Sequence, residues 1–204
     1  MTDAVIFDLD GTLLDSSAQD EALYKLAVER VLGKVTFRPH LADYDHVTDT
    51  GILLQLLDDN DLSPDPGTIT EIKNEFFRRV EAFVTETGPF EEIPGAREML
   101  QRLADSESHG IAIATGGWQR SAEIKLRTAG FEMRNVPLVT SDDAIDRTDI
   151  MRIALQAIGT DVRSVTYFGD GPWDRQACQS LGWTFRPVGP LLNGLSSFEH
   201  EFVS

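Results

Sequence analysis

The chain has 204 residues, 41% of them hydrophobic, and a formal net charge of -16 at neutral pH. This length allows one substantial core with a smaller appended module. The acidic excess would repel the phosphates of nucleic acid, so we expect no nucleic-acid partner. The single cysteine, Cys178, excludes an internal disulfide bond. No apolar run approaches the roughly 18 residues of a membrane span, and the N-terminus has no signal-peptide pattern. We therefore expect a cytoplasmic monomer or homodimer with no membrane partner.

Short apolar segments followed by polar turns recur along the chain. Their residues are 4–7, 111–114, 136–139, 165–168 and, last, 184–188. Helical patterns separate several of them, at 96–104, 121–129 and 149–158. Strands that alternate with helices predict an α/β fold with a Rossmann-like, doubly wound parallel sheet. Ligands of such sheets bind outside the carboxyl ends of the strands, where these polar turns would gather.

The segment 16–90 breaks this alternation. Apolar spacing predicts helices at 19–32, 52–57 and 69–84, and Pro-rich residues 64–67 predict a turn. We interpret this block as a helical cap domain inserted after the first strand, where it would cover the functional edge of the sheet. The catalytic core would then comprise residues 1–15 and 91–204.

Two pairs of aspartates stand at two strand ends. Asp8 and Asp10 are two residues apart, so on a regular strand their carboxylates face the same way. Asp170 and Asp174 frame the turn after a later strand. Like charges this close require a cation or a shared proton, and Mg2+ prefers carboxylate oxygens. Since four His and one Cys show no zinc-type spacing, we predict a magnesium site at these four aspartates.

Two further pairs of residues near the strand ends are interpreted from their local sequence pattern. Gly11 and Thr12 form a turn whose backbone N–H groups would point at an anion, so we expect both residues to bind the phosphate of the substrate. Asp142 and Asp143 fit the pattern of turn or cap residues, so we do not assign them to the metal site.

These motifs resemble those of the haloacid dehalogenase (HAD) superfamily, in particular its phosphoglycolate-phosphatase-like members. The first motif of that family, DxDGT, is intact at 8–12, and its fourth, GDxxxD, is at 169–174. Thr115 stands where the second motif has a Thr or Ser. The third motif normally has a Lys, and here Arg147 is the candidate. An alternative for Arg147 is a surface residue at a helix start. Lys125 and Arg127 lie on a predicted helix and are not chosen.

The resemblance implies a magnesium-dependent phosphohydrolase that acts on a small phosphorylated metabolite. Asp8 would be the nucleophile that forms an aspartyl-phosphate, and Asp10 would be the general acid/base. Thr115 and Arg147 would hold phosphate oxygens. Magnesium would bind Asp8, the backbone carbonyl of Asp10, and Asp170, with Asp174 supporting the ligand shell.

Three alternatives are weighed on the same residues. Dehalogenases of the superfamily lack the second aspartate, which is present here as Asp10. Its phosphomutases place a His shortly after the first motif, whereas residues 15–20 contain none. A phosphomutase is therefore the second choice. A catalytically silent binding protein with this fold is the third, although all four aspartates are kept.

Substrate selection is assigned to residues around the predicted cap. In the loop 46–51, Thr50 and Gly51 are candidates for reaching the substrate. An ordinary helix-entry turn capped by Thr48 or Asp49 fits the loop equally well. Gly116 and Trp118 follow Thr115 and are candidate pocket residues, although Trp118 could instead pack a helix start. The leaving group stays open, and the segment after Gly189 carries no prediction.

Overall fold

The computed structural model describes residues 1–159, 161–199 and 201 of the chain. A five-stranded parallel sheet has the order β3-β2-β1-β4-β5. The strands are β1 (Thr2–Phe7), β2 (His109–Ala114), β3 (Leu138–Val139), β4 (Val162–Gly169) and β5 (Thr184–Pro187). The predicted α/β class with a doubly wound parallel sheet is therefore confirmed.

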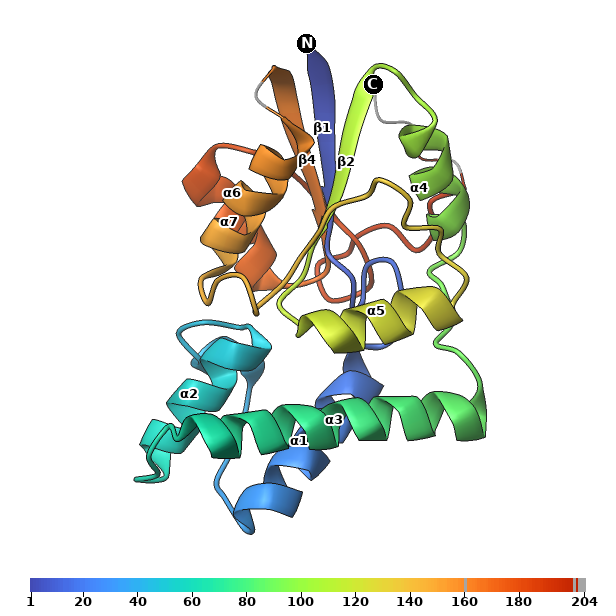
Figure 1. Cartoon of the computed structure of the whole chain (residues 1–204). Helices are drawn as coiled ribbons and strands as arrows, with labels where there is room; N and C mark the ends of the chain where they lie inside the picture. Colours follow the sequence, from blue (N-terminus) through green and yellow to red (C-terminus); the bar gives the residue numbers. More distant parts are fainter. Residues whose placement is uncertain (160, 200, 202–204) are drawn as a thin grey trace.

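Both faces of the sheet are buried, which explains why its strands are continuous apolar runs. Phe7 and Phe168 belong to the core on one face, and Ile6 and Tyr167 to the core on the other. Helices α4 (Ala96–Ala104) and α5 (Gln119–Thr128) contribute to the first core, and α6 (Arg147–Ile158) and α7 (Pro172–Leu181) to the second. Figure 1 shows α6 and α7 on one side of the strands and α4 on the other, with α5 near the carboxyl ends of the strands, above α3.

Three helices between β1 and α4 lie beyond the carboxyl ends of the strands (Figure 1). They are α1 (Ser17–Leu32), α2 (Asp49–Asp59) and α3 (Pro66–Thr87), with a short 3-10 helix at Leu41–Asp43. All three were predicted; the end of α1 at Leu32 was correct, and the other ends were predicted two or three residues short. The predicted turn at 64–67 is the start of α3, where Asp65 accepts a hydrogen bond from the Thr68 N–H at 2.8 Å.

Hydrogen bonds and an ion pair join these inserted helices to the sheet layer. Thr48 Oγ1 donates to the Ile145 carbonyl at 2.9 Å, and Lys73 of α3 pairs with Asp142. Asp142 also accepts from the N–H of Gln119, the first residue of α5, at 2.8 Å. This capping confirms the interpretation of Asp142 from the sequence. Among the described residues, no helix is long and apolar enough to cross a membrane.

The segment after β5 returns to the core through one aromatic side chain. Phe198 is 1% exposed, and its ring lies 5.5 Å from that of Phe168 and 6.1 Å from that of Phe7, centroid to centroid. Phe7 and Phe168 themselves stack at 5.1 Å. The segment therefore closes the core directly beneath the strands that precede Asp8 and Asp170.

We expect Phe198→Ala to lower the free energy of unfolding by about 3–5 kcal/mol, because it leaves a cavity in a packed aromatic cluster. Urea denaturation measures the loss. Leu26→Ala, at a 47% exposed position on α1, is the control and should change stability by less than about 0.5 kcal/mol. Equal effects of the two substitutions would show that the segment is not part of the core.

Candidate active site

The register of β1 and β4 places the two aspartate pairs at one edge of the sheet. Phe7 pairs with Phe168, and the N–H of Asp8 donates to the Phe168 carbonyl at 2.9 Å. One carboxylate oxygen each of Asp8, Asp170 and Asp174 lies within 4.8 Å of the others. Three of the four predicted ligands thus converge, and their oxygen donors are of the kind that magnesium prefers.

The carboxylate of Asp10 is turned toward a different partner. Its Oδ1 accepts hydrogen bonds from Ser16 Oγ at 2.5 Å and from Lys125 Nζ at 2.6 Å. Lys125 Nζ also donates to Asp20 Oδ1 at 2.6 Å. The Lys125 side chain is 1% exposed, so its charge depends on these two carboxylates. The Asp10 carboxylate is not part of the convergent group of Asp8, Asp170 and Asp174, so the backbone carbonyl of Asp10 stays the candidate ligand.

Arg147 is the first residue of α6 and reaches across to the aspartate cluster. Its Nη1 donates to Asp8 Oδ1 at 3.1 Å and lies 3.4 Å from Asp174 Oδ1, and its Nη2 donates to the Val47 carbonyl at 3.1 Å. A Cβ on Gly116 would lie 2.7 Å from Nη2, so glycine at this position leaves room for the guanidinium. The candidate third-motif residue therefore lies beside Asp8 with its side chain only 11% exposed, and it is not a surface arginine.

Burial and mutual repulsion act on the protonation of this cluster. Burial raises the pKa of Asp8 well above its ordinary value; Arg147 opposes the shift, while Asp174 and Asp170 add to it. Burial, followed by Asp174, raises the pKa of Asp170 to about 7. Burial acts to lower the pKa of Arg147, but Asp174 and Asp8 outweigh it and the pKa is raised. One arginine thus leaves the carboxylates undercompensated, as expected at a site for a divalent cation.

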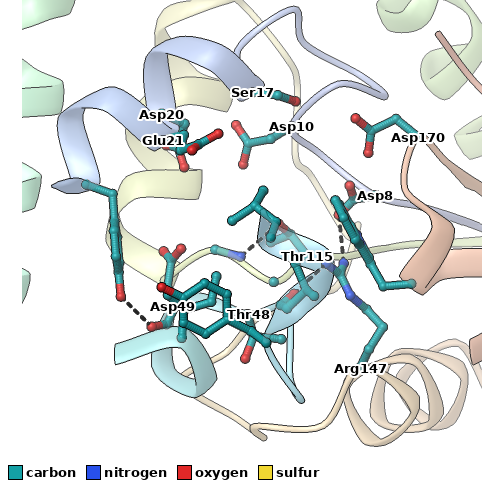
Figure 2. A pocket seen from close by; sticks show the side chains of 18 of the residues that line it. Asp8, Asp10, Ser17, Asp20, Glu21, Thr48, Asp49, Thr115, Arg147 and Asp170 are labelled. Atoms are coloured by element: carbon teal, nitrogen blue, oxygen red, sulfur yellow. Dashed lines mark hydrogen bonds and ion pairs between the residues drawn. The ribbon is translucent and has the colours of Figure 1, made fainter. Parts of the chain in front are cut away.

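A cavity of about 380 Å³ lies between this edge and the inserted helices. Figure 2 shows Asp8, Asp170, Thr115 and Arg147 on one side of it, and Asp20 and Glu21 on the other. Gly116 also lines the cavity, as predicted, and Thr115 Oγ1 there accepts the Gly117 N–H at 3.1 Å.

Gly11 and Thr12 support the edge without lining the cavity. Gly11 has φ +78°, and a Cβ there would lie 2.0 Å from Asp170 Oδ2. Only glycine permits this close approach of the first motif to the second strand end. Thr12 is fully buried, and its Oγ1 has no hydrogen-bond partner among the described residues.

The structure keeps three candidate substrate residues away from the cavity. Trp118 is fully buried, its ring 5.5 Å from that of Tyr24, and its Nε1 donates to Thr50 Oγ1 at 2.8 Å. Thr50 in turn donates to the Ser141 carbonyl, which fixes it against the sheet layer. A Cβ on Gly51 would lie 2.6 Å from the Cβ of His46, so Gly51 makes room for its own loop and not for a ligand.

The structure agrees with the alternative interpretations of Trp118 and of the loop 46–51. Trp118 packs a helix start, and Thr48 caps α2 by accepting the Gly51 N–H at 3.1 Å. The loop nevertheless reaches the cavity as predicted, but through Val47, Thr48 and Asp49 and not through Thr50 and Gly51.

Sequence reasoning missed Lys125, which contacts Asp10. The sequence signal was a lysine between two apolar residues of a helix, Ile124 and Leu126, and the structure buries all three. A lysine at such a position needs buried carboxylate partners. Asp20, on α1, supplies the second of them.

We expect Lys125→Met to destabilise the protein by about 3 kcal/mol, because it leaves Asp10 and Asp20 without their shared cation. Adding Asp20→Asn should recover part of the loss, since it removes one of the two uncompensated charges. Urea denaturation of the single and double variants measures both effects. The exposed Arg127→Met on the same helix is the control, and an equal loss there would contradict the bridging role.

Comparisons with known proteins agree with this geometry. A family model for haloacid dehalogenase-like hydrolases matches residues 2–182. A search of curated proteins found no match.

Solved structures share the fold at low sequence identity. A hydrolase from Pseudomonas syringae has 24% identity and a TM-score of 0.71, with 91% of this chain and 84% of that chain covered. CbbY from Rhodobacter sphaeroides, in complex with phosphate, has 22% identity and a TM-score of 0.68, with 99% and 91% covered. A β-phosphoglucomutase from Clostridium difficile has 15% identity and a TM-score of 0.71, with 95% and 87% covered. With the family model matching most of its length, the chain belongs to the haloacid dehalogenase-like hydrolases.

Proposed function

We propose that the protein is a magnesium-dependent phosphohydrolase that cleaves a small organic phosphomonoester through an aspartyl-phosphate on Asp8. The observation that carries the proposal is the position of Asp8. Its carboxylate is buried beside Arg147 and two further aspartates, on the wall of a cavity that opens toward Asp10 and the inserted helices.

The residues present fit a magnesium ion. The oxygen ligands would come from Asp8, the backbone carbonyl of Asp10, and Asp170, while Asp174 is held by the Gly171 N–H at 3.0 Å and by Arg147. Magnesium bound there would offset charge on the transferring phosphoryl group. Arg147 supplies a fixed positive charge beside the same carboxylates, and its fork suits phosphate oxygens.

In the first step, an oxygen of Asp8 attacks phosphorus, the bond from phosphorus to the leaving oxygen breaks, and Asp10 gives that oxygen its proton. In the second step, Asp10 removes a proton from water, which attacks the phosphoryl group and releases Asp8 and inorganic phosphate. Ser16 and Lys125 hold one oxygen of Asp10, which leaves the other for the leaving group and the water. Thr115 and Arg147, both on the cavity wall, would hold phosphate oxygens.

Asp20, the last residue of the segment 15–20, favours hydrolysis over the mutase reaction. Mutases that resemble this chain have a His there, whereas this chain has Asp20, whose carboxylate is tied to Lys125. The inserted helices act in this proposal as a cap that shields the site and selects the metabolite. A binding protein without catalytic activity would have no need for a largely buried arginine, Arg147, paired with the carboxylate of Asp8.

Asp8→Asn should abolish turnover of p-nitrophenyl phosphate with magnesium, because the amide is close in size but cannot act as the nucleophile. The fold should persist, with a melting temperature no lower than that of the wild type, since the change removes a charge from a repulsive cluster. A steady-state assay on material checked by mass spectrometry for deamidation measures the loss. Activity within about tenfold of wild type would refute the chemistry.

A further inference from the structure

The half of the cavity that lies away from Asp8 is built from the inserted helices and is rich in acceptors. Asp20, Glu21 and Asp49 line it together with aromatic and aliphatic side chains. Figure 2 shows these three acids on the side opposite Asp8 and Asp170, with Asp10 between the two groups. If Asp8 takes the phosphoryl group, this half receives the leaving group.

The cations that line this half are already neutralised by the protein. Lys25 Nζ pairs with Glu21 Oε1 at 2.5 Å. Arg38 makes a two-pronged pair with Asp59, Nε to Oδ2 at 2.7 Å and Nη2 to Oδ1 at 2.8 Å. Its Nη1 donates to the Asp43 carbonyl at 2.5 Å. Each of these two cations therefore already has a carboxylate partner from the protein.

Asp49 adds an acceptor that is only partly used. It is 9% exposed and lines the cavity. Its Oδ2 accepts the Trp118 N–H at 2.9 Å, and no hydrogen bond within the described residues reaches its Oδ1. Burial raises the pKa of this carboxyl, and in either protonation state it offers an oxygen acceptor and no positive charge.

We infer that this half of the cavity selects leaving groups that carry hydroxyl or ammonium donors and no anionic group. The substrates would be monophosphates of polyols, sugars or amino alcohols, and bisphosphates and phosphorylated carboxylic acids would be rejected. The inference rests on the proposed function. Its physical basis is that the cations next to this half are paired with the protein's own carboxylates, Lys25 with Glu21 and Lys125 with Asp20. A carboxylate or second phosphate would have to displace one of these partners, whereas a hydroxyl or ammonium donor can bond to Asp49 Oδ1, which is free of hydrogen bonds within the described residues.

The test compares phosphomonoesters of similar size in which a terminal hydroxymethyl or aminomethyl group is replaced by a carboxylate. Glycerol 3-phosphate is paired with 3-phosphoglycerate, and phosphoethanolamine with phosphoglycolate, each as a competitor of p-nitrophenyl phosphate hydrolysis. In both pairs we expect the member without a carboxylate to have an apparent inhibition constant at least about tenfold lower than that of the member with one. Constants within threefold of each other, failure of all four to compete, or preference for the acids would overturn the inference.

Two variants with matched controls locate the cause of the selection. Glu21→Gln removes the carboxylate partner of Lys25, and Asp59→Asn removes that of Arg38. Each substitution should reduce the ratio of inhibition constants within a pair of competitors by about threefold or more. Glu29→Gln on the same helix as Glu21, and Asp58→Asn beside Asp59, remove the same charge at exposed positions and should leave the difference unchanged. Equal effects of a variant and its control would overturn the inference.

The assay also separates this inference from the proposed chemistry. Hydrolysis of p-nitrophenyl phosphate that depends on magnesium and Asp8, together with competitors that show no charge preference, would contradict the inference alone. Absence of hydrolysis of every phosphomonoester would contradict both.

Discussion

Parallel pairing of β1 with β4 is the constraint on which the site depends. Because both strands end at the same edge, Asp8 and Asp170 are forced together, and α7 adds Asp174 one turn later. Three carboxylates in a buried setting repel one another, and Arg147 compensates for only part of that charge. Gly11 is required at the same edge because a side chain there would collide with Asp170.

A second charge cluster joins the inserted helices to the sheet layer. Lys125 of α5 binds Asp10 of the first motif and Asp20 of α1, so the position of a helix in the insertion is coupled to the orientation of Asp10. The Lys73 pair with Asp142 makes a similar link from α3. The cavity is therefore bounded by elements held together through charged contacts.

The sheet, its helices and the first and fourth motifs could be predicted from the sequence, because they depend on local apolar periodicity and on fixed spacing. Arg147 was identified from its order in the chain, and the structure places it beside Asp8. Trp118 and Thr50 were predicted to line the pocket, but neither does. The direction of the Trp118 ring depends on its packing against α1, and that of Thr50 on its hydrogen bond to the Ser141 carbonyl. The Lys125 bridge and the contact of Phe198 with Phe7 also escaped prediction, because in both cases the partners lie more than 100 residues apart in the chain.

The most direct test of the account is the melting temperature with and without magnesium, at ionic strength matched with sodium chloride. Magnesium at about 100 times its dissociation constant should stabilise the protein by roughly 2.7 kcal/mol, because it binds the folded cluster and hardly binds the unfolded chain. Asp170→Asn should lose most of this magnesium-specific rise, and Asp58→Asn, at an exposed position, should keep it. An equal rise in the wild type and in Asp170→Asn, or no rise in the wild type, would contradict a metal site at this edge.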